Sequence, residues 1–175
     1  MTMAATVVLG IGNTLWGDDG FGVAAAQRLA AHPDLPDTVS VVDGGTQGLY
    51  LLPLVQEARD LLVLDSVDFG APPGTLKVLR DDDIPRFFGQ RPLSLHQTAF
   101  TDVLFAAELT GARPQRITLI GAQYENLDLW GGGVTATLVD VLDAVVELAL
   151  SELAAWSVGT RINEVPSCPM TTFRI

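Results

Sequence analysis

One glycine-rich segment near the beginning of the chain, residues 9–22 (LGIGNTLWGDDGFG), constrains the fold more than any other. The apolar run at 6–9 that precedes it is typical of a buried strand, and the alanine-rich run at 23–29 that follows it favours a helix. A strand, a glycine-rich turn and a helix in this order predict the first unit of an α/β domain.

This turn differs from a dinucleotide-binding turn in two ways. Its glycines, Gly10, Gly12 and Gly17, do not have the spacing of that fingerprint. In addition, Asp18 and Asp19 stand where the helix is expected to begin, and two carboxylates there would repel a phosphate. The turn is therefore predicted to present carboxylates. Asp18 either caps the helix or takes part in function, and Asp19 is assigned to function because one cap residue is sufficient.

The remaining periodic segments extend the α/β pattern. Expected strands lie at 6–9, 38–42, 61–64, 75–79 and 116–121, and expected helices at 23–31, 47–57, 97–109 and 135–156. Pro53 should kink the second helix, and the strand at 75–79 suits an edge, where it can run antiparallel. The pattern predicts a three-layer α/β/α fold with a twisted, mostly parallel sheet and helices on both faces. Residues 1–158 should form a single domain, and 159–175 a flexible tail.

Aspartates follow the first three of these strands. Asp19 follows the first, Asp43 the second and Asp65 the third. Because ligands of parallel sheets bind beyond the carboxyl ends of the strands, we expect these acids to meet at one edge. The segment after the second strand comprises Asp43, Gly44, Gly45 and Thr46. It is either part of a groove for a bound peptide or plain turn chemistry.

His96, one of two histidines, stands at the entrance of the helix predicted at 97–109. A helix N-terminus disfavours the protonated imidazole, and the neutral ring is the form that binds metal. Asp19, Asp65 and His96 therefore form a predicted ligand set of two carboxylates and one imidazole, which suits nickel, zinc or iron.

Composition excludes several other functions. The net charge of −11 disfavours nucleic acid and anionic membranes as partners, because both require clustered basic residues. Four acids interrupt the apolar segment at 134–156, which argues against a membrane span. A single cysteine, Cys168, cannot form an internal disulfide, and the chain has no signal-peptide pattern, so we expect a cytoplasmic protein.

Ser94 lies too close along the chain to His96 for a serine triad. The remaining kinds of catalysis are metal-linked chemistry and acid–base catalysis by a pair of aspartates.

Four motifs resemble those of the nickel–iron hydrogenase maturation endopeptidases. They are GIGNTLW with DDG at 10–20, DGGT at 43–46, Asp65 with the turn at 72–75, and SLHQ at 94–97. The order and spacing are similar over about residues 6–156, and the likeness is greatest to the branch that serves uptake hydrogenases. The resemblance implies a five-stranded sheet between helices, and Asp19, Asp65 and His96 as the metal-contacting residues. The family usually has Glu where this chain has Asp19, which retracts the carboxylate by one methylene.

The resemblance also implies a substrate, the large-subunit precursor of a nickel–iron hydrogenase, whose C-terminal extension is removed once nickel is in place. Two carboxylates and one histidine are few ligands for a permanently held ion. We therefore expect the nickel to arrive with the substrate. One alternative is a non-enzymatic nickel-binding chaperone of the large subunit. A further one is a nucleotide-binding module in which Asp43 would hold a ribose.

Overall fold

The computed structural model describes the backbone of residues 5–84 and 95–162 and the side chains of residues 6–84 and 98–157. Five strands form one sheet in the order β2-β1-β3-β5-β4. All neighbouring pairs are parallel except β4 with β5, which is antiparallel. The strands are β1 (Ala5–Ile11), β2 (Val39–Gly45), β3 (Ala58–Val67), β4 (Leu76–Arg80) and β5 (Arg116–Gln123). The predicted fold class and the antiparallel edge strand are both confirmed.

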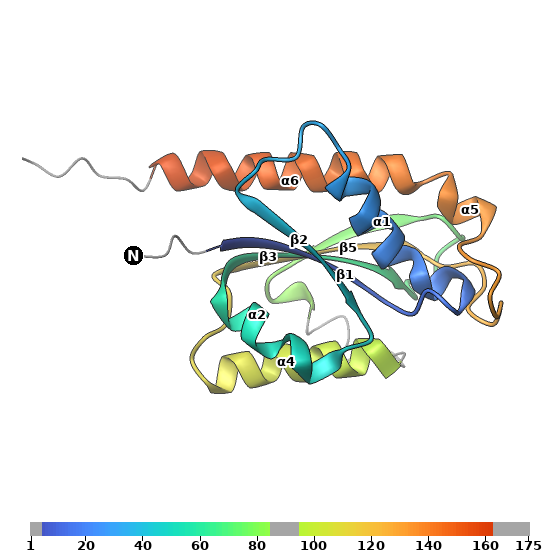
Figure 1. Ribbon diagram of the computed structural model, residues 1–175, viewed down its shortest axis with the longest axis horizontal. Coiled ribbons are helices and arrows are strands. Elements are labelled where there is room, and N and C mark those ends of the chain that lie inside the picture. Colours follow the sequence, from blue (N-terminus) through green and yellow to red (C-terminus); the bar gives the residue numbers. More distant parts are fainter. Residues whose placement is uncertain (1–4, 85–94, 163–175) are drawn as a thin grey trace, which may run out of the picture.

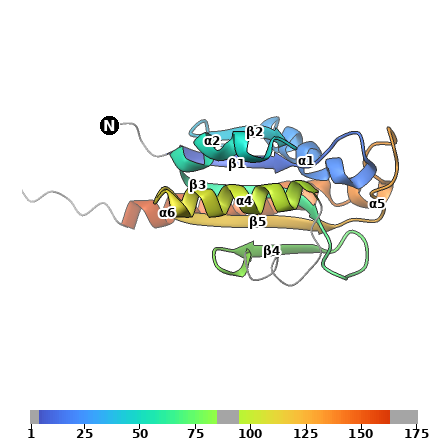
Figure 2. The same ribbon diagram turned by 90° about the horizontal axis from the view of Figure 1, so that it is seen from below.

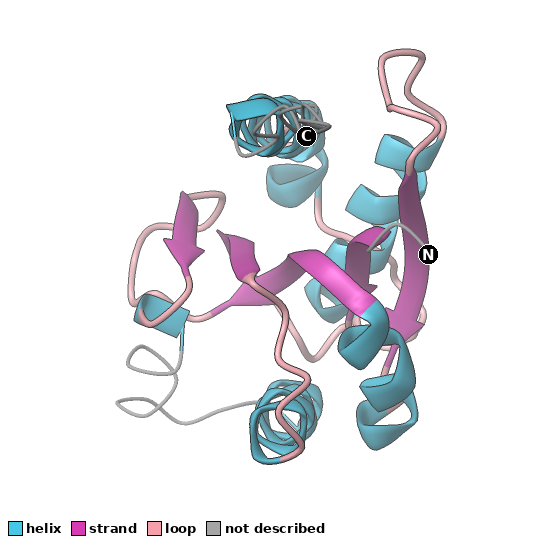
Figure 3. Ribbon diagram, turned by 90° about the vertical axis from the view of Figure 1, so that its left-hand side faces the viewer, coloured by secondary structure: helices cyan, strands magenta, loops and turns pink. Residues whose placement is uncertain are grey.

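Helices cover both faces of the sheet, as Figures 1 and 3 show. The face carrying Val8, Leu62 and Ile120 packs against α1 (Phe21–Ala30), α5 (Ala136–Val139) and α6 (Leu142–Ile162). The opposite face packs against α2 (Leu52–Glu57) and α4 (Leu95–Leu109). Because the three central strands are covered on both sides, the middle of each is mainly apolar. Figure 2 shows β4 at the edge of the sheet.

Four strands, β1, β2, β3 and β5, are longer than predicted, and in β2 and β3 the difference changes the position of an acid. β3 continues to Val67, so Asp65 lies within the strand and is fully buried rather than directly after it. β2 continues to Gly45, so Asp43 is also a strand residue, paired in register with Gly10 of β1. The short apolar runs marked the centres of both strands, but backbone pairing extends them into polar sequence.

The segment predicted as one helix at 47–57 is a 3₁₀ turn, η2 (Gly48–Leu51), followed by α2. Pro53 therefore does not kink a continuous helix. It lies in the first turn of α2, where its missing N–H has no helical partner to lose.

The segment predicted as one helix at 135–156 is divided into α5 and α6, with a break at 140–141. α6 continues to Ile162, past the expected domain end at residue 158, and residues 163–175 lie outside the described part of the chain. No helix among the described residues is both long and apolar enough to cross a membrane.

Candidate active site

The glycine-rich segment fixes the start of α1 against the ends of β1 and β3. A Cβ on Gly22 would lie 2.2 Å from the carbonyl oxygen of Leu64 and 2.4 Å from that of Ile11. A Cβ on Gly10 would lie 2.4 Å from the carbonyl oxygen of Gly22. These glycines therefore allow close helix–sheet packing. Because Asp65 follows Leu64 in sequence, the same contact places the beginning of α1 beside this acid.

Asp19 lies in the 3₁₀ turn η1 (Gly17–Gly20) that precedes α1, and its side chain is half-buried. Its Oδ2 accepts a hydrogen bond from the backbone N–H of Asn13 at 3.0 Å. Gly12 has a φ of +125°, and a Cβ there would lie 1.8 Å from the carbonyl oxygen of Asp19. Only glycine can occupy this position, so the backbone of β1 fixes the place of Asp19.

Asp65 is 0% exposed and lies opposite Gly121 of β5 in the sheet. A Cβ on Gly121 would lie 2.7 Å from Cζ of Phe69, so the absence of a side chain makes room for the phenyl ring. Asp65 thus sits in a strand that is covered on both faces, beside a buried aromatic residue. A buried carboxylate requires hydrogen bonds or a cation to remain charged.

His96 lies in the first turn of α4, and its side chain is outside the described residues. A Cβ on Gly48 of η2 would lie 3.3 Å from Cβ of Ala99, which places this end of α4 beside the segment that follows β2. The first turn of α4, which includes the backbone of His96, therefore lies near the carboxyl end of β2. Among the side chains that the structure describes, no three His, Cys, Asp or Glu residues form a metal-binding group. The structure places Asp19 in the 3₁₀ turn between β1 and α1 and Asp65 within the neighbouring strand β3, and the ligand set stays a prediction.

The predicted substrate-binding segment lies at the end of β2 and has two environments. Asp43 and Thr46 are exposed. Gly44 is buried, and a Cβ there would lie 3.2 Å from Cγ2 of Ile11. Gly45 has a φ of +45°, and its carbonyl accepts the N–H of Gly12 at 2.9 Å. Both glycines therefore have a structural reason to be there, which supports turn chemistry for the pair. Asp43 and Thr46 remain available to a ligand.

Asp18 does not cap a helix, because neither η1 nor α1 has a side-chain cap. Its buried carboxylate instead accepts three backbone N–H groups from the loop at 125–135. Oδ2 accepts those of Glu125 and Asn126 at 2.8 and 2.9 Å, and Oδ1 accepts that of Thr135 at 2.7 Å. The donors are more than a hundred residues away in sequence, so local pattern could not reveal them. Asp18 is a structural anchor that holds the two loops together.

The loops anchored by Asp18 carry an aromatic pair that sequence reasoning missed. Trp16 and Trp130 form an isolated bridge, and their ring centroids lie 4.8 Å apart in an edge-to-face arrangement. The N–H of Gly131 donates to the carbonyl of Leu15 at 2.8 Å. Both tryptophans are partly exposed, and they lie at the same edge of the sheet as Asp19.

Gln123 is a second residue that the sequence did not single out. Its side chain is buried, and Oε1 accepts the backbone N–H of Phe69 at 2.6 Å and that of Ala71 at 3.3 Å. It therefore fixes the loop that follows β3, and through this loop the position of Phe69 beside Asp65. A lone glutamine at a strand end carries no sequence signal for such a role.

In open α/β sheets, ligands bind beyond the carboxyl ends of the strands, which is the edge that Asp19 follows. Comparison with known proteins gives the family. The family model described as "Hydrogenase maturation protease" matches residues 23–152. The chain is 50% identical over 152 residues to the hydrogenase expression/formation protein HupD of Rhodobacter capsulatus, covering 87% of this chain and 72% of that protein. It is 34% identical over 161 residues to the hydrogenase 2 maturation protease of Escherichia coli, covering 91% of this chain and 94% of that protein.

Solved structures agree with these relatives. The hydrogenase maturating endopeptidase HybD from E. coli superimposes with a TM-score of 0.80 at 34% identity, covering 86% of this chain and 93% of that one. The chain therefore belongs to the hydrogenase maturation protease family, whose members are peptide-bond hydrolases.

Proposed function

We propose that the protein is an endopeptidase that removes the C-terminal extension from the large-subunit precursor of a nickel–iron hydrogenase after nickel insertion. Family membership supports the protease activity. Of the structural observations, the proposal depends most on the placement of Asp19 in the turn after β1 and of Asp65 in the neighbouring strand β3, beside the packed start of α1.

In this proposal the nickel is carried by the substrate. Asp19 and Asp65 offer carboxylate oxygens, and His96 would add an imidazole, a donor set that nickel accepts. The residues would detect the ion when the precursor docks, and this would bring the scissile peptide bond to the same edge of the sheet. A metal ion at that place can polarise the peptide carbonyl or activate water. Asp19 or Asp65 would then serve as the general base.

The surroundings of the two carboxylates suit different parts of this task. Asp65 is held within a strand, so its position is rigid and its access to water is small. Asp19 is half-buried and lies in a turn that faces the edge of the sheet. We infer that Asp65 mainly fixes the ion, and that Asp19 contacts both the ion and the entering water. Asp43 and Thr46 would contact the docked polypeptide.

Processing of the purified precursor with and without nickel tests this proposal. Mass spectrometry should show shortening of the nickel-loaded precursor and an intact nickel-free precursor. Equal cleavage of both forms would refute recognition of the ion. An intact precursor bound in a one-to-one complex would instead identify a chaperone. The single cysteine and the net charge of −11 lead us to place this reaction in the cytoplasm, without nucleic acid as a partner.

A further inference from the structure

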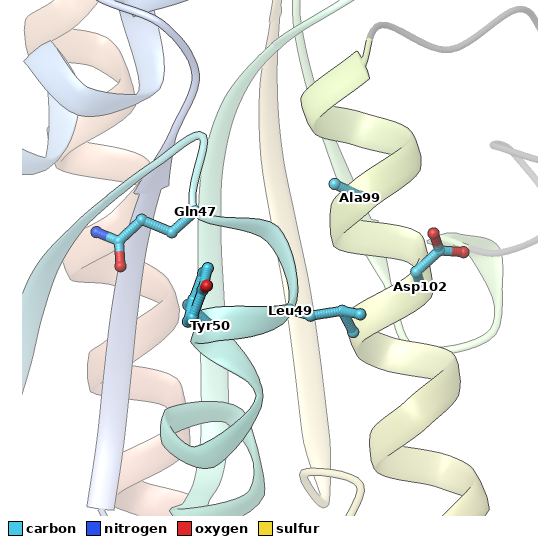
Figure 4. Close-up of a pocket in the computed structure, with 5 residues that line it drawn as sticks. All are labelled: Gln47, Leu49, Tyr50, Ala99 and Asp102. Atoms are coloured by element: carbon cyan, nitrogen blue, oxygen red, sulfur yellow. The ribbon is translucent and has the colours of Figure 1, made fainter.

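A cavity of about 370 Å³ lies between η2 and the first half of α4, next to the segment that ends β2. Figure 4 shows the side chains that line it, with Leu49 directed toward α4. They are Gln47, Leu49, Tyr50, Ala99 and Asp102. Its volume is within the range of about 300–1,000 Å³ that is usual for ligand pockets.

The walls of this cavity expose large side chains that a folded protein normally covers. Leu49 is 58% exposed and Tyr50 is 90% exposed. At this place η2 lies close to α4, because a Cβ on Gly48, whose φ is +55°, would lie 3.3 Å from Cβ of Ala99. The tight turn therefore presents both residues outward, and neither belongs to the two core clusters of the fold.

Among the described residues that line the cavity, Asp102 carries the one charged side chain, and its charge is negative. Asp102 is exposed, and no hydrogen bond or ion pair with another described residue involves its carboxylate. The segment at 37–57 and helix α4 contain acidic residues but no Lys or Arg. A site with apolar walls, an aromatic face and a carboxylate without a cation partner is complementary to a long basic side chain.

We propose that this cavity binds an arginine or lysine side chain on the surface of the precursor protein, as a docking contact separate from the two acids at the ends of β1 and β3. The aliphatic stem would pack on Leu49 and Ala99. The cation would lie against the ring of Tyr50 and pair with Asp102. The identity of the partner depends on the proposed function. The contact would contribute to affinity for the precursor and not to cleavage of the peptide bond.

Affinity for the purified, nickel-loaded precursor tests this contact. Asp102→Asn should raise the Kd about threefold to fivefold, and Asp102→Asn combined with Tyr50→Ala about tenfold or more. The wild-type Kd should rise with salt, and the Asp102→Asn variant should be less sensitive. Glu108→Gln removes an equally exposed charge from the same helix, away from the cavity, and should leave the Kd unchanged. Because both altered residues are exposed, the melting temperatures should stay the same.

The outcomes separate this contact from the proposed function. If the wild type cleaves the precursor and Asp102→Asn binds it as tightly as the wild type does, the docking contact is wrong and the activity stands. If Asp102→Asn weakens binding no more than Glu108→Gln does, the contact is also wrong. A wild type that binds with the expected dependence on Asp102 but leaves the precursor intact overturns only the activity. Absence of any binding by the wild type overturns both.

Discussion

Asp18 and Asp19 are adjacent in sequence and carry the same charge, yet they lie in opposite environments. Asp18 is 0% exposed, and both of its oxygens accept backbone N–H groups from a distant loop. Asp19 is half-buried, and its Oδ2 accepts the backbone N–H of Asn13 from its own loop. One turn of 3₁₀ helix is enough to direct one carboxylate into the protein and the other toward the edge of the sheet.

This difference suggests that, of two adjacent acids, Asp18 has a structural role and Asp19 a functional one. Three backbone N–H groups meet the hydrogen-bonding needs of the Asp18 carboxylate without any cation. Such a residue holds two loops together, and a bound metal ion would add little to its stabilisation. The two neighbours should therefore respond to substitution in different measurements, Asp19 in activity and Asp18 in stability.

Asp19→Asn is expected to give the largest effect on function. It should lower the rate of precursor processing by at least about 100-fold, because the amide can neither accept a proton nor bind a metal as a carboxylate does. The side-chain oxygen can still accept the N–H of Asn13, so the fold should be retained. Mass spectrometry of the precursor measures the rate, and circular dichroism checks the fold. We expect His96→Ala to have a similar effect.

Asp19→Glu is the matched control for this loss. It keeps the charge, extends the carboxylate by one methylene and introduces the residue usual at this position in the resembling family. Processing should remain within about tenfold of the wild-type rate if the carboxylate is the essential group. Normal processing by Asp19→Asn would remove Asp19 from the site.

Asp18→Asn should have the largest effect on stability. The amide can offer only one oxygen to the three N–H donors, and its NH₂ group would face a donor that it cannot satisfy. We expect the free energy of unfolding to fall by about 2–3 kcal/mol, measured by urea denaturation. The fluorescence of Trp16 and Trp130 should also change, because these tryptophans lie on the two loops that Asp18 joins.

The control for Asp18 is Asp128→Asn in the same distant loop. Asp128 is exposed, and its substitution should change the free energy of unfolding by no more than about 0.5 kcal/mol. Equal stability losses in the two variants would mean that the charge of the loop matters, and not the three hydrogen bonds.

Glu152 on α6 provides a third kind of carboxylate, which is paired with an arginine. It accepts hydrogen bonds from Arg80 at 2.9 and 2.7 Å, and chiefly for this reason its pKa is lower than the usual 4.5. A lowered pKa in the folded state stabilises the protein above pH 4.5, and this stabilisation is lost as the pH falls through the lowered value. Because Arg80 is largely exposed, we expect Glu152→Gln to cost only about 0.5–1 kcal/mol at pH 7.

Urea denaturation of both proteins between pH 7 and pH 3 measures this effect. The difference in the free energy of unfolding should shrink as the pH falls below 4.5. A constant difference would assign the loss to packing of the side chain. Asp143→Asn, whose pair with Arg28 is exposed on both sides, should change stability by less.

Much of the fold could be predicted because its signals are local. The apolar runs of the central strands and the glycine-rich turn identified the parallel sheet, and the charged sequence of β4 identified an edge strand. The ends of elements were less accurate. Asp65 and Asp43 were placed after their strands, although backbone pairing with neighbours includes both of them.

Only those parts of the site could be predicted whose place in the fold follows from their place in the sequence. The rule that parallel sheets put the carboxyl ends of their strands together predicts one shared edge for Asp19 and Asp65, and their joint role stays a prediction. The partners of Asp18 and the role of Gln123 depend on contacts between residues more than fifty positions apart. No periodicity or composition records such contacts, so only the three-dimensional structure reveals them.

The place of β5 in the sheet has a consequence for the newly synthesised protein. β5 is the last strand made, yet it lies between β3 and β4, and the loop that follows it supplies all three donors to Asp18. A ribosome-bound chain that ends before residue 135 therefore lacks one of the N–H groups that anchor Asp18, and the glycine-rich turn at 9–22 is not yet held in place. This member of the hydrogenase maturation protease family can therefore complete its own turn only when most of its chain has left the ribosome.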